Sequence, residues 1–144
     1  MTTDSLSPQD ALVAVMIAVS AADERVSDRE LKWIFSIIDI LPVFQGYDRN
    51  RVSNVIGVVN DLFEDEDGID ALVGLVDQAL PDHLHETAYA LACDVSAADG
   101  RLEMTELRLL EILRHDLNVD RLTSAAIERG ARARHQRLEP RGTA

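Results

Sequence analysis

Residues 95–107 read VSAADGRLEMTEL, and residues 19–31 read VSAADERVSDREL, so one pattern occurs twice at an offset of 76 positions. Between residues 14–31 and 90–107 the two copies agree at nine of eighteen positions, where roughly one agreement would be expected by chance. Each copy joins an apolar, Ala-rich segment to a tight turn and a new segment that begins near an acidic residue. The repeat therefore predicts two related helix-loop-helix halves in one fold.

Capping signals and the spacing of apolar residues indicate helices along the rest of the chain. Ser7-Pro8 is typical of a helix start, and Ser27 with Glu30 forms a capping-box pattern before apolar residues at helical spacing. No segment alternates apolar and polar residues with period two, as a half-buried strand would. We predict an all-α fold of about seven helices, which begin near Pro8, Ser27, Asp48, Ile69, Pro81, Glu103 and Asp120.

The first and fifth expected helices are both rich in alanine. Small side chains allow two helix axes to approach closely. We therefore expect these two helices to cross near their middles and to be related by an approximate two-fold axis. That symmetry would place the two Asp-containing turns on related sides of the molecule.

Length and charge limit the kinds of partner. The 144 residues are expected to form a single domain over residues 1–144, with a short basic polar tail from about residue 136. The net charge is −12: residues 1–120 contain 8 basic and 24 acidic side chains, whereas residues 121–144 contain six Arg and two Glu. An acidic body repels phosphate, so no nucleic-acid partner is predicted. The late Arg residues are expected to solvate the last helix or to lie against the acidic body.

Cysteine and histidine usage favours a cytoplasmic protein without a structural zinc site. Cys93 is the single cysteine, so no internal disulfide can form, and it is expected to be a small core residue. The four histidines lack the spacing of a helical metal pair and are expected on the surface: His83, His85, His115 and His135. The longest apolar run, residues 11–22, is well short of the roughly twenty residues that span a bilayer.

The repeated motif supplies four candidate metal ligands: Asp23, Glu30, Asp99 and Glu106. On one continuous helix, carboxylates seven residues apart would be separated by about 10.5 Å of rise. A turn between them lets the Glu of the next helix point back at the loop. Such hard oxygen donors suit Ca²⁺ or Mg²⁺, although the spacing is not that of an EF-hand.

A structural role for the same residues is the alternative. An Asp at a helix exit can bond loop amides, and a Glu three residues inside the next helix can cap it, with no ion present. Arg25 and Arg101 lie inside the turns and could neutralise the carboxylates. The acidic run over residues 64–70 is interpreted as a solvated loop.

Enzyme motifs are missing from the sequence. It contains no Gly-rich phosphate loop, no Gly-x-Ser-x-Gly, no His-Glu-x-x-His and no recognisable pair of nucleophile and base. A non-enzymatic protein that binds a cation or a protein partner is therefore predicted, and a homodimer is left open. The alternative is a purely structural protein–protein interaction domain with no metal site.

The repeated motif also resembles the TerB family. The likeness rests on AADGRL at residues 97–102 followed by Glu106-Leu107, with the related residues 21–23 and 30–31, and it extends over roughly residues 11–117. This family is named for tellurite resistance and is similar to the amino-terminal part of the membrane-anchored DnaJ-like co-chaperone DjlA. The resemblance implies an all-helical, pseudo-symmetric domain, a cytoplasmic stress-associated role in bacteria, and metal binding by the acidic motif residues Asp23, Glu30, Asp99 and Glu106.

One position departs from the family pattern. The second copy keeps Asp99-Gly100, but the first has Asp23-Glu24. If the position requires a positive φ, Glu costs on the order of 1 kcal/mol relative to Gly. The first loop is then expected to adopt another shape, which argues against a symmetric pair of ion sites.

Overall fold

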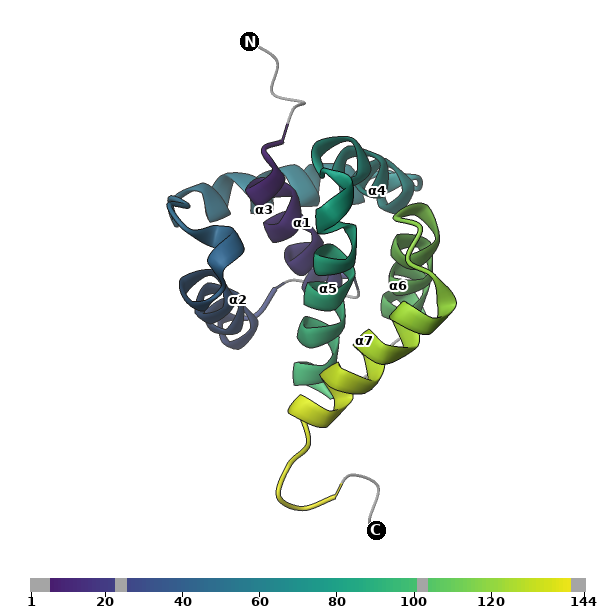
Figure 1. Ribbon diagram of the computed structural model, residues 1–144. Coiled ribbons are helices and arrows are strands. Elements are labelled where there is room, and N and C mark those ends of the chain that lie inside the picture. The colour runs from purple at the N-terminus through teal and green to yellow at the C-terminus, as the bar shows by residue number, and fades with distance from the viewer. Residues whose placement is uncertain (1–5, 23–25, 101–103, 141–144) are drawn as a thin grey trace.

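The computed structural model describes residues 6–22, 26–100 and 104–140, and every regular element in them is a helix, as the sequence predicts (Figure 1). Two of these elements are single 3₁₀ turns, labelled η. In chain order the elements are α1 (Pro8–Ala21), α2 (Asp28–Ile40), η1 (Pro42–Phe44), α3 (Arg51–Phe63), α4 (Gly68–Ala79), η2 (Asp82–Leu84), α5 (His85–Asp99), α6 (Met104–Asp116) and α7 (Arg121–Arg134).

Side-chain caps fix the starts of three helices. At α1 the Ser7 hydroxyl accepts a hydrogen bond from the N–H three residues ahead at 3.0 Å. At α2 Ser27 and Glu30 exchange both bonds of the predicted capping box. At α7 the Asp120 carboxylate accepts the Thr123 N–H at 2.8 Å. Each cap satisfies an N–H that a helix start leaves unpaired, which is why these starts could be predicted from the sequence.

The starts of α5 and α4 can also be compared with the predictions. The fifth helix begins at His85 rather than near Pro81, because Leu80 and Pro81 are extended and a 3₁₀ turn, η2, precedes the helix. A residue before proline is disfavoured in the helical region, so Leu80 ends α4 in an extended conformation. The break before α4 falls at Gly68, as expected. Only glycine fits at this position, because a Cβ there would overlap the Leu62 carbonyl.

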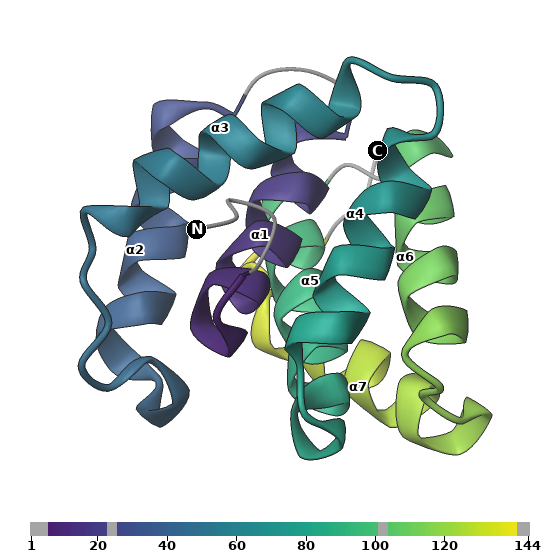
Figure 2. The same cartoon turned by 90° about the horizontal axis from the view of Figure 1, so that it is seen from above.

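Helix α1 is the centre of the core. Every residue from Ala11 to Val19 has at most 2% of its surface exposed, which agrees with a sequence that is apolar almost all round. Helices α3, α4 and α5 pack around α1 (Figure 2). Burying side chains such as Leu12 and Ile17 contributes about 1.5–3 kcal/mol each, so this helix supplies much of the stability.

Helix α5 is the second largely buried helix of the core. It packs against α1, as the Ala-rich patterns predict, and it also contacts α6 and α7. Helix α7 packs on α5, whereas α6 lies between α5 and α4 and contacts both (Figures 1 and 2). The offset of 76 pairs α1 with α5 and α2 with α6. The approximate two-fold relation between the halves stays a prediction. In the part of the chain described, no helix is long and apolar enough to cross a membrane.

Candidate functional site

The motif carboxylate of the first copy closes its own turn. Glu30 is the third residue of α2, and its Oε1 accepts the backbone N–H of Ser27 at 2.9 Å, while the Ser27 hydroxyl accepts the N–H of Glu30 at 3.1 Å. This reciprocal pair is the arrangement that a compact helix-loop-helix requires with no ion present. For Glu30, the geometry therefore favours the structural role.

The equivalent residue of the second copy lies in a different environment. Glu106 is only 6% exposed, and its Oε2 accepts a hydrogen bond from the Ser96 hydroxyl of α5 at 2.7 Å. The counterpart of Ser96 in the first copy is Ser20, which is also buried. The Ser20 hydroxyl has no hydrogen-bond partner in the part of the chain that the structure describes. The two copies share sequence but use their Ser and Glu differently.

The other two predicted ligands, Asp23 and the side chain of Asp99, lie outside the described residues. Among the described residues, no group of three or more His, Cys, Asp or Glu side chains could hold a metal ion. Gly100 caps α5 with φ 78° and ψ −3°, a left-handed conformation that favours glycine. This left-handed conformation explains why glycine follows Asp99 in the second copy. The first copy has Glu24 at the equivalent position.

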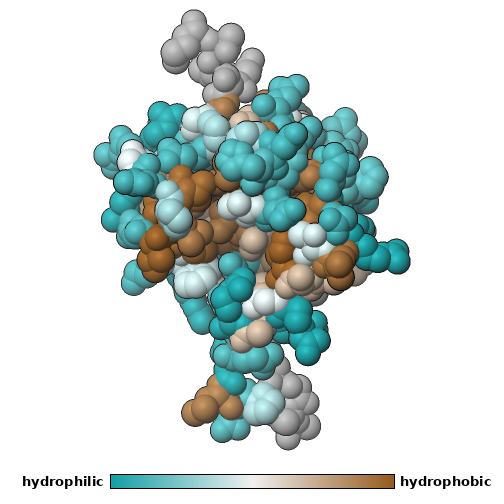
Figure 3. Space-filling view, in the orientation of Figure 1, coloured by the Kyte–Doolittle hydropathy of each residue, from teal (hydrophilic) through white to brown (hydrophobic). Residues whose placement is uncertain are grey.

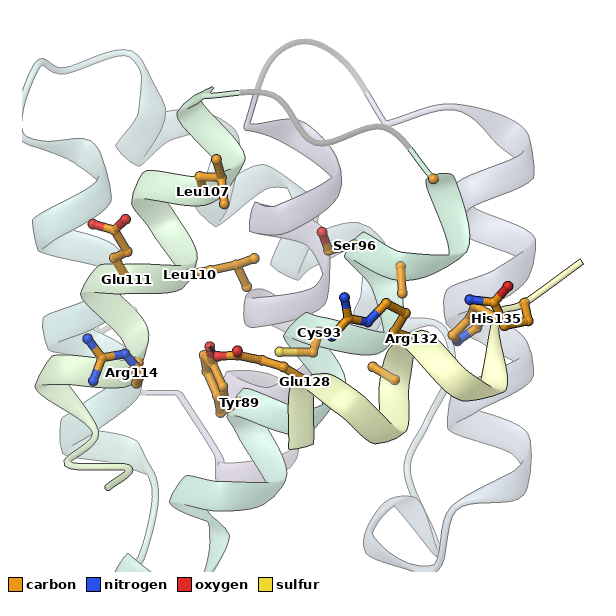
Figure 4. A pocket seen from close by; sticks show the side chains of 14 residues that line it. Tyr89, Cys93, Ser96, Leu107, Leu110, Glu111, Arg114, Glu128, Arg132 and His135 are labelled. Carbon is orange, nitrogen blue, oxygen red and sulfur yellow. Dashed lines mark hydrogen bonds between the residues drawn. The ribbon is translucent and has the colours of Figure 1, made fainter. Parts of the chain in front are cut away.

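A cavity of about 540 Å³ opens between α5, α6 and α7 (Figure 4). Tyr89, Cys93 and Ala97 of α5 form its floor, and Leu107 and Leu110 of α6 form one wall. The space-filling view shows apolar side chains in the hollow where these three helices meet (Figure 3). The volume falls within the range of small-molecule pockets, about 300–1,000 Å³.

The polar groups at the floor of this cavity are not activated for catalysis. Burial raises the pKa of the Cys93 thiol to about 12, so the thiol is neutral near pH 7. Burial and the nearby Glu128 carboxylate raise the pKa of Tyr89, whose hydroxyl donates to Glu128 Oε2 at 2.6 Å. A neutral thiol and a phenol that is already bonded make poor nucleophiles and bases, so the cavity is better suited to binding than to covalent chemistry.

Two of the four histidines are not surface residues, which corrects the sequence-based expectation. The side chain of His85 is 14% exposed, with Nδ1 3.1 Å from the Leu117 carbonyl oxygen. The side chain of His135 is 16% exposed and packs edge-on against the Trp33 ring at a centroid distance of 5.4 Å. Their partners lie more than thirty residues away or on another helix, so short spacing rules could not find them. His83 and His115 are exposed as expected.

The end of α7 is attached to α5 by an arginine. Arg134 Nη2 donates to Asp94 Oδ1 of α5 at 2.6 Å, and His135 Nε2 lies 3.5 Å from the same carboxylate oxygen. For Arg134, this confirms the expectation that late arginines lie against the acidic body. The bond also fixes the end of α7 beside the cavity.

An ion pair between a buried carboxylate and a half-exposed arginine at the start of α1 was not predicted. Asp10 is 2% exposed and accepts hydrogen bonds from the Tyr47 hydroxyl at 2.8 Å and from Arg51 Nε at 3.0 Å, and Arg51 Nη2 donates to its second oxygen. Burial raises the pKa of Asp10, but the bonds from Arg51 and Tyr47 outweigh it and hold the pKa below 3.8. An acid opening an apolar helix was visible in the sequence, whereas its partners 37 and 41 residues away were not.

Comparison with models of known protein families identifies the family of this chain. The family model described as "Tellurite resistance protein TerB" matches residues 9–129. The chain belongs to the TerB family. A search of curated proteins and a search of solved structures each found no match. The TerB match includes both copies of the motif, the Asp10 ion pair and most of the cavity lining, and the all-α fold fits the expectation drawn from the resemblance.

Proposed function

We propose that this TerB-family protein is a non-enzymatic stress-response module that acts by binding. Its acidic turns would hold a divalent cation, Ca²⁺ or Mg²⁺, or would present a charged surface to a protein partner. The observation that supports this proposal best is the position of Glu106. A buried carboxylate oriented by the Ser96 hydroxyl lies just inside the helix that follows the Asp99-Gly100 turn.

The donor chemistry favours the second turn over the first as the cation site. Carboxylate oxygens and loop carbonyls are the ligands that Ca²⁺ and Mg²⁺ prefer. In the second copy, Asp99 and Glu106 would be the ligands, and Gly100 allows the chain to turn sharply between them. In the first copy, Glu30 caps α2, and Asp23 would need other partners. We therefore propose one principal site rather than two equal ones.

The alternative is a purely structural protein–protein interaction domain without a metal site. The Glu30 capping box supports it, because that carboxylate closes its turn with backbone and side-chain groups alone. If Asp99 and Glu106 act in the same way, the function depends entirely on contacts with other proteins.

The deciding experiment measures the thermal midpoint of chelator-treated protein during titration with Ca²⁺, Mg²⁺ and Zn²⁺. A ligand that binds only the folded state raises the midpoint, by an amount equivalent to about 2.7 kcal/mol at a hundredfold excess over the dissociation constant. Under the cation proposal, one ion gives a saturable rise, and Asp99→Asn and Glu106→Gln each abolish it. Both substitutions remove a charge and nearly preserve shape.

Glu30→Gln is the matched control. It removes the equivalent carboxylate of the first copy, so it is expected to lower the midpoint slightly and to leave the ion-dependent rise unchanged. A flat response of the unmodified protein to all three ions would refute the cation site and favour the structural alternative. Equal loss of the rise in Glu30→Gln would instead indicate that both turns share one site.

A further inference from the structure

The cavity between α5, α6 and α7 borders the second turn, because Ser96 and Gly100 both line it, and its floor along α5 is mostly apolar. The two hydroxyls on the floor are already used, since Tyr89 donates to Glu128 and Ser96 donates to Glu106. Apart from Gly100, the rest of the floor and its nearest walls are alanine, leucine and a neutral thiol. The other polar and charged residues that line the cavity are Glu111, Arg114, Arg132, His135 and Gln136. A ligand that enters this cavity must therefore bury an apolar body.

The length of the floor suggests the size of that body. From Tyr89 to Ala97 the helix rises about 12 Å, which matches an extended aliphatic chain of roughly ten carbons. Figure 4 shows α6 and α7 on opposite sides of this floor, with Leu110 directed over it from α6 and Cys93 at its centre. An aliphatic chain could lie along α5 between these two walls.

The charge above the floor suggests the head group. Arg132 of α7 lines the cavity and extends over Cys93 (Figure 4). Within the described residues its guanidinium makes no hydrogen bond or ion pair, in contrast to Arg134 two residues later, which is bonded to Asp94. Glu128, four residues earlier on α7, also lines the cavity, and its Oε2 accepts the Tyr89 hydroxyl, but it forms no ion pair with Arg132. An unpaired guanidinium beside an apolar hollow is suited to an anionic, planar group.

The rim on the α6 side carries opposite charges that balance each other. Glu111 and Arg114 both line the cavity, and in Figure 4 both side chains point away from α7. Their charges sum to zero, and neither lies over the floor. Arg132 therefore provides the one cationic group, among the described residues, that extends over the centre of the cavity.

We propose that the α5–α6–α7 cavity binds a medium-chain aliphatic carboxylate, with the chain on the floor formed by Tyr89, Cys93 and Ala97 and the carboxylate bonded to Arg132. The ligand is a free acid of roughly eight to twelve carbons, as the floor length indicates. This site gives the TerB-family fold a small-molecule ligand in addition to any cation at the turns.

Titration calorimetry with decanoate, kept below its micelle concentration, tests the proposal on the full chain. Saturable binding of one decanoate per protein is expected. Arg132→Gln should weaken it by about tenfold or more, because a charge-assisted bond is lost. Arg129→Gln is the matched control: this exposed α7 arginine does not line the cavity, and its loss should change affinity less than about twofold. Decanol, which has the same chain and no charge, should bind equally to all three proteins.

A second variant tests where the aliphatic chain of the ligand binds. Ala97→Leu adds bulk to a half-buried floor position, so it should fold normally, as judged by its thermal midpoint, and lose decanoate binding. Absence of saturable decanoate binding, or binding that Ala97→Leu leaves intact, overturns the site. Equal weakening by Arg132→Gln and Arg129→Gln overturns the role of Arg132. Binding of an amphipathic helical peptide, but not of decanoate, would make the cavity a protein-docking groove and refute the proposal.

Discussion

The Ser96 hydroxyl donates a 2.7 Å hydrogen bond to the buried carboxylate of Glu106, and this bond distinguishes the two halves of the repeat. Its counterpart is lost in the first half, where Ser20 is buried without a partner in the described part of the chain and Glu30 caps α2. One inherited pattern thus has two structural outcomes. The second half has kept a buried polar contact close to its Asp-Gly turn.

Replacing these two serines by alanine should have unequal effects. Ser96→Ala leaves a buried carboxylate without one of its donors, so it should lower the free energy of unfolding by about 1–3 kcal/mol. Ser20→Ala removes a hydroxyl that is buried unpaired, and it should be neutral within about 0.5 kcal/mol or stabilising. Urea unfolding of both variants measures the difference. Equal destabilisation would mean that Ser20 has an equivalent partner.

Two glycine substitutions should change stability in opposite directions. Gly100 has φ 78°, so Gly100→Ala should cost about 1–2 kcal/mol. Gly74 lies on the exposed face of α4, where an added Cβ would meet only open space, and Gly74→Ala should gain about 0.5–1 kcal/mol from helix propensity. Thermal unfolding of the pair is the measurement. A neutral Gly100→Ala would show that the turn tolerates a side chain, as the Glu24 of the first copy would require.

The Asp10–Arg51 ion pair should account for part of the loss of folding stability at low pH. Its pKa is lowered in the folded protein, so its stabilisation is complete above about pH 3.8 and is lost as the pH falls through the lower folded value. Arg51→Gln removes the main interaction that offsets burial and should raise this pKa, so the loss begins at a higher pH. Urea midpoints between pH 2 and 6 measure the shift.

Arg49→Gln is the control for that shift. Arg49 Nε lies 3.6 Å from Asp39 Oδ1 in an exposed pair, and its guanidinium lies over the Phe35 ring at 4.6 Å from the centroid. Exposed contacts of this kind contribute little, so its urea midpoints should differ from those of the unmodified protein by a small amount that is the same across the whole pH range. If Arg51→Gln also shows the pH dependence of the unmodified protein, Asp10 does not depend on Arg51 for its ionisation.

Cys93 should react very slowly in the folded protein. With a pKa of about 12, its thiolate fraction at pH 8 is on the order of one in ten thousand, and the side chain is buried. Modification by a chromogenic disulfide should be at least about a hundredfold slower in buffer than in urea, where one thiol per chain should react fully. Similar rates in both conditions would contradict a neutral core thiol.

The prediction from sequence succeeded where the interactions are local. The Ser27–Glu30 capping box and the Asp120 cap lie within three residues of the amides they bond, so sequence and structure agree there. The burial of α1 from Ala11 to Val19 likewise agrees with a local pattern that leaves no polar face. The start of α5 was missed by four residues, since a 3₁₀ turn after Pro81 competes with the helix.

The candidate sites depended more on tertiary contacts. The sequence singled out Glu30 and Glu106 as equivalent and indicated the capping role of Glu30, but only the packing of α5 against α6 made Glu106 a buried partner of Ser96. Nothing in the pattern indicated the cavity, because its lining comes from three helices whose angles are set by how they pack on α5. The Asp10–Arg51 and Trp33–His135 contacts were missed for the same reason.

By itself, the sequence determined the all-α class, the duplicated helix-loop-helix and its relation to TerB, because helix periodicity, caps and a repeat are short-range features of the chain. The tertiary structure decided which equivalent residues became different and where a cavity opened. Those outcomes depend on side chains that are distant in sequence and share space only after the helices have packed, when burial and hydrogen bonding set the energy of each group.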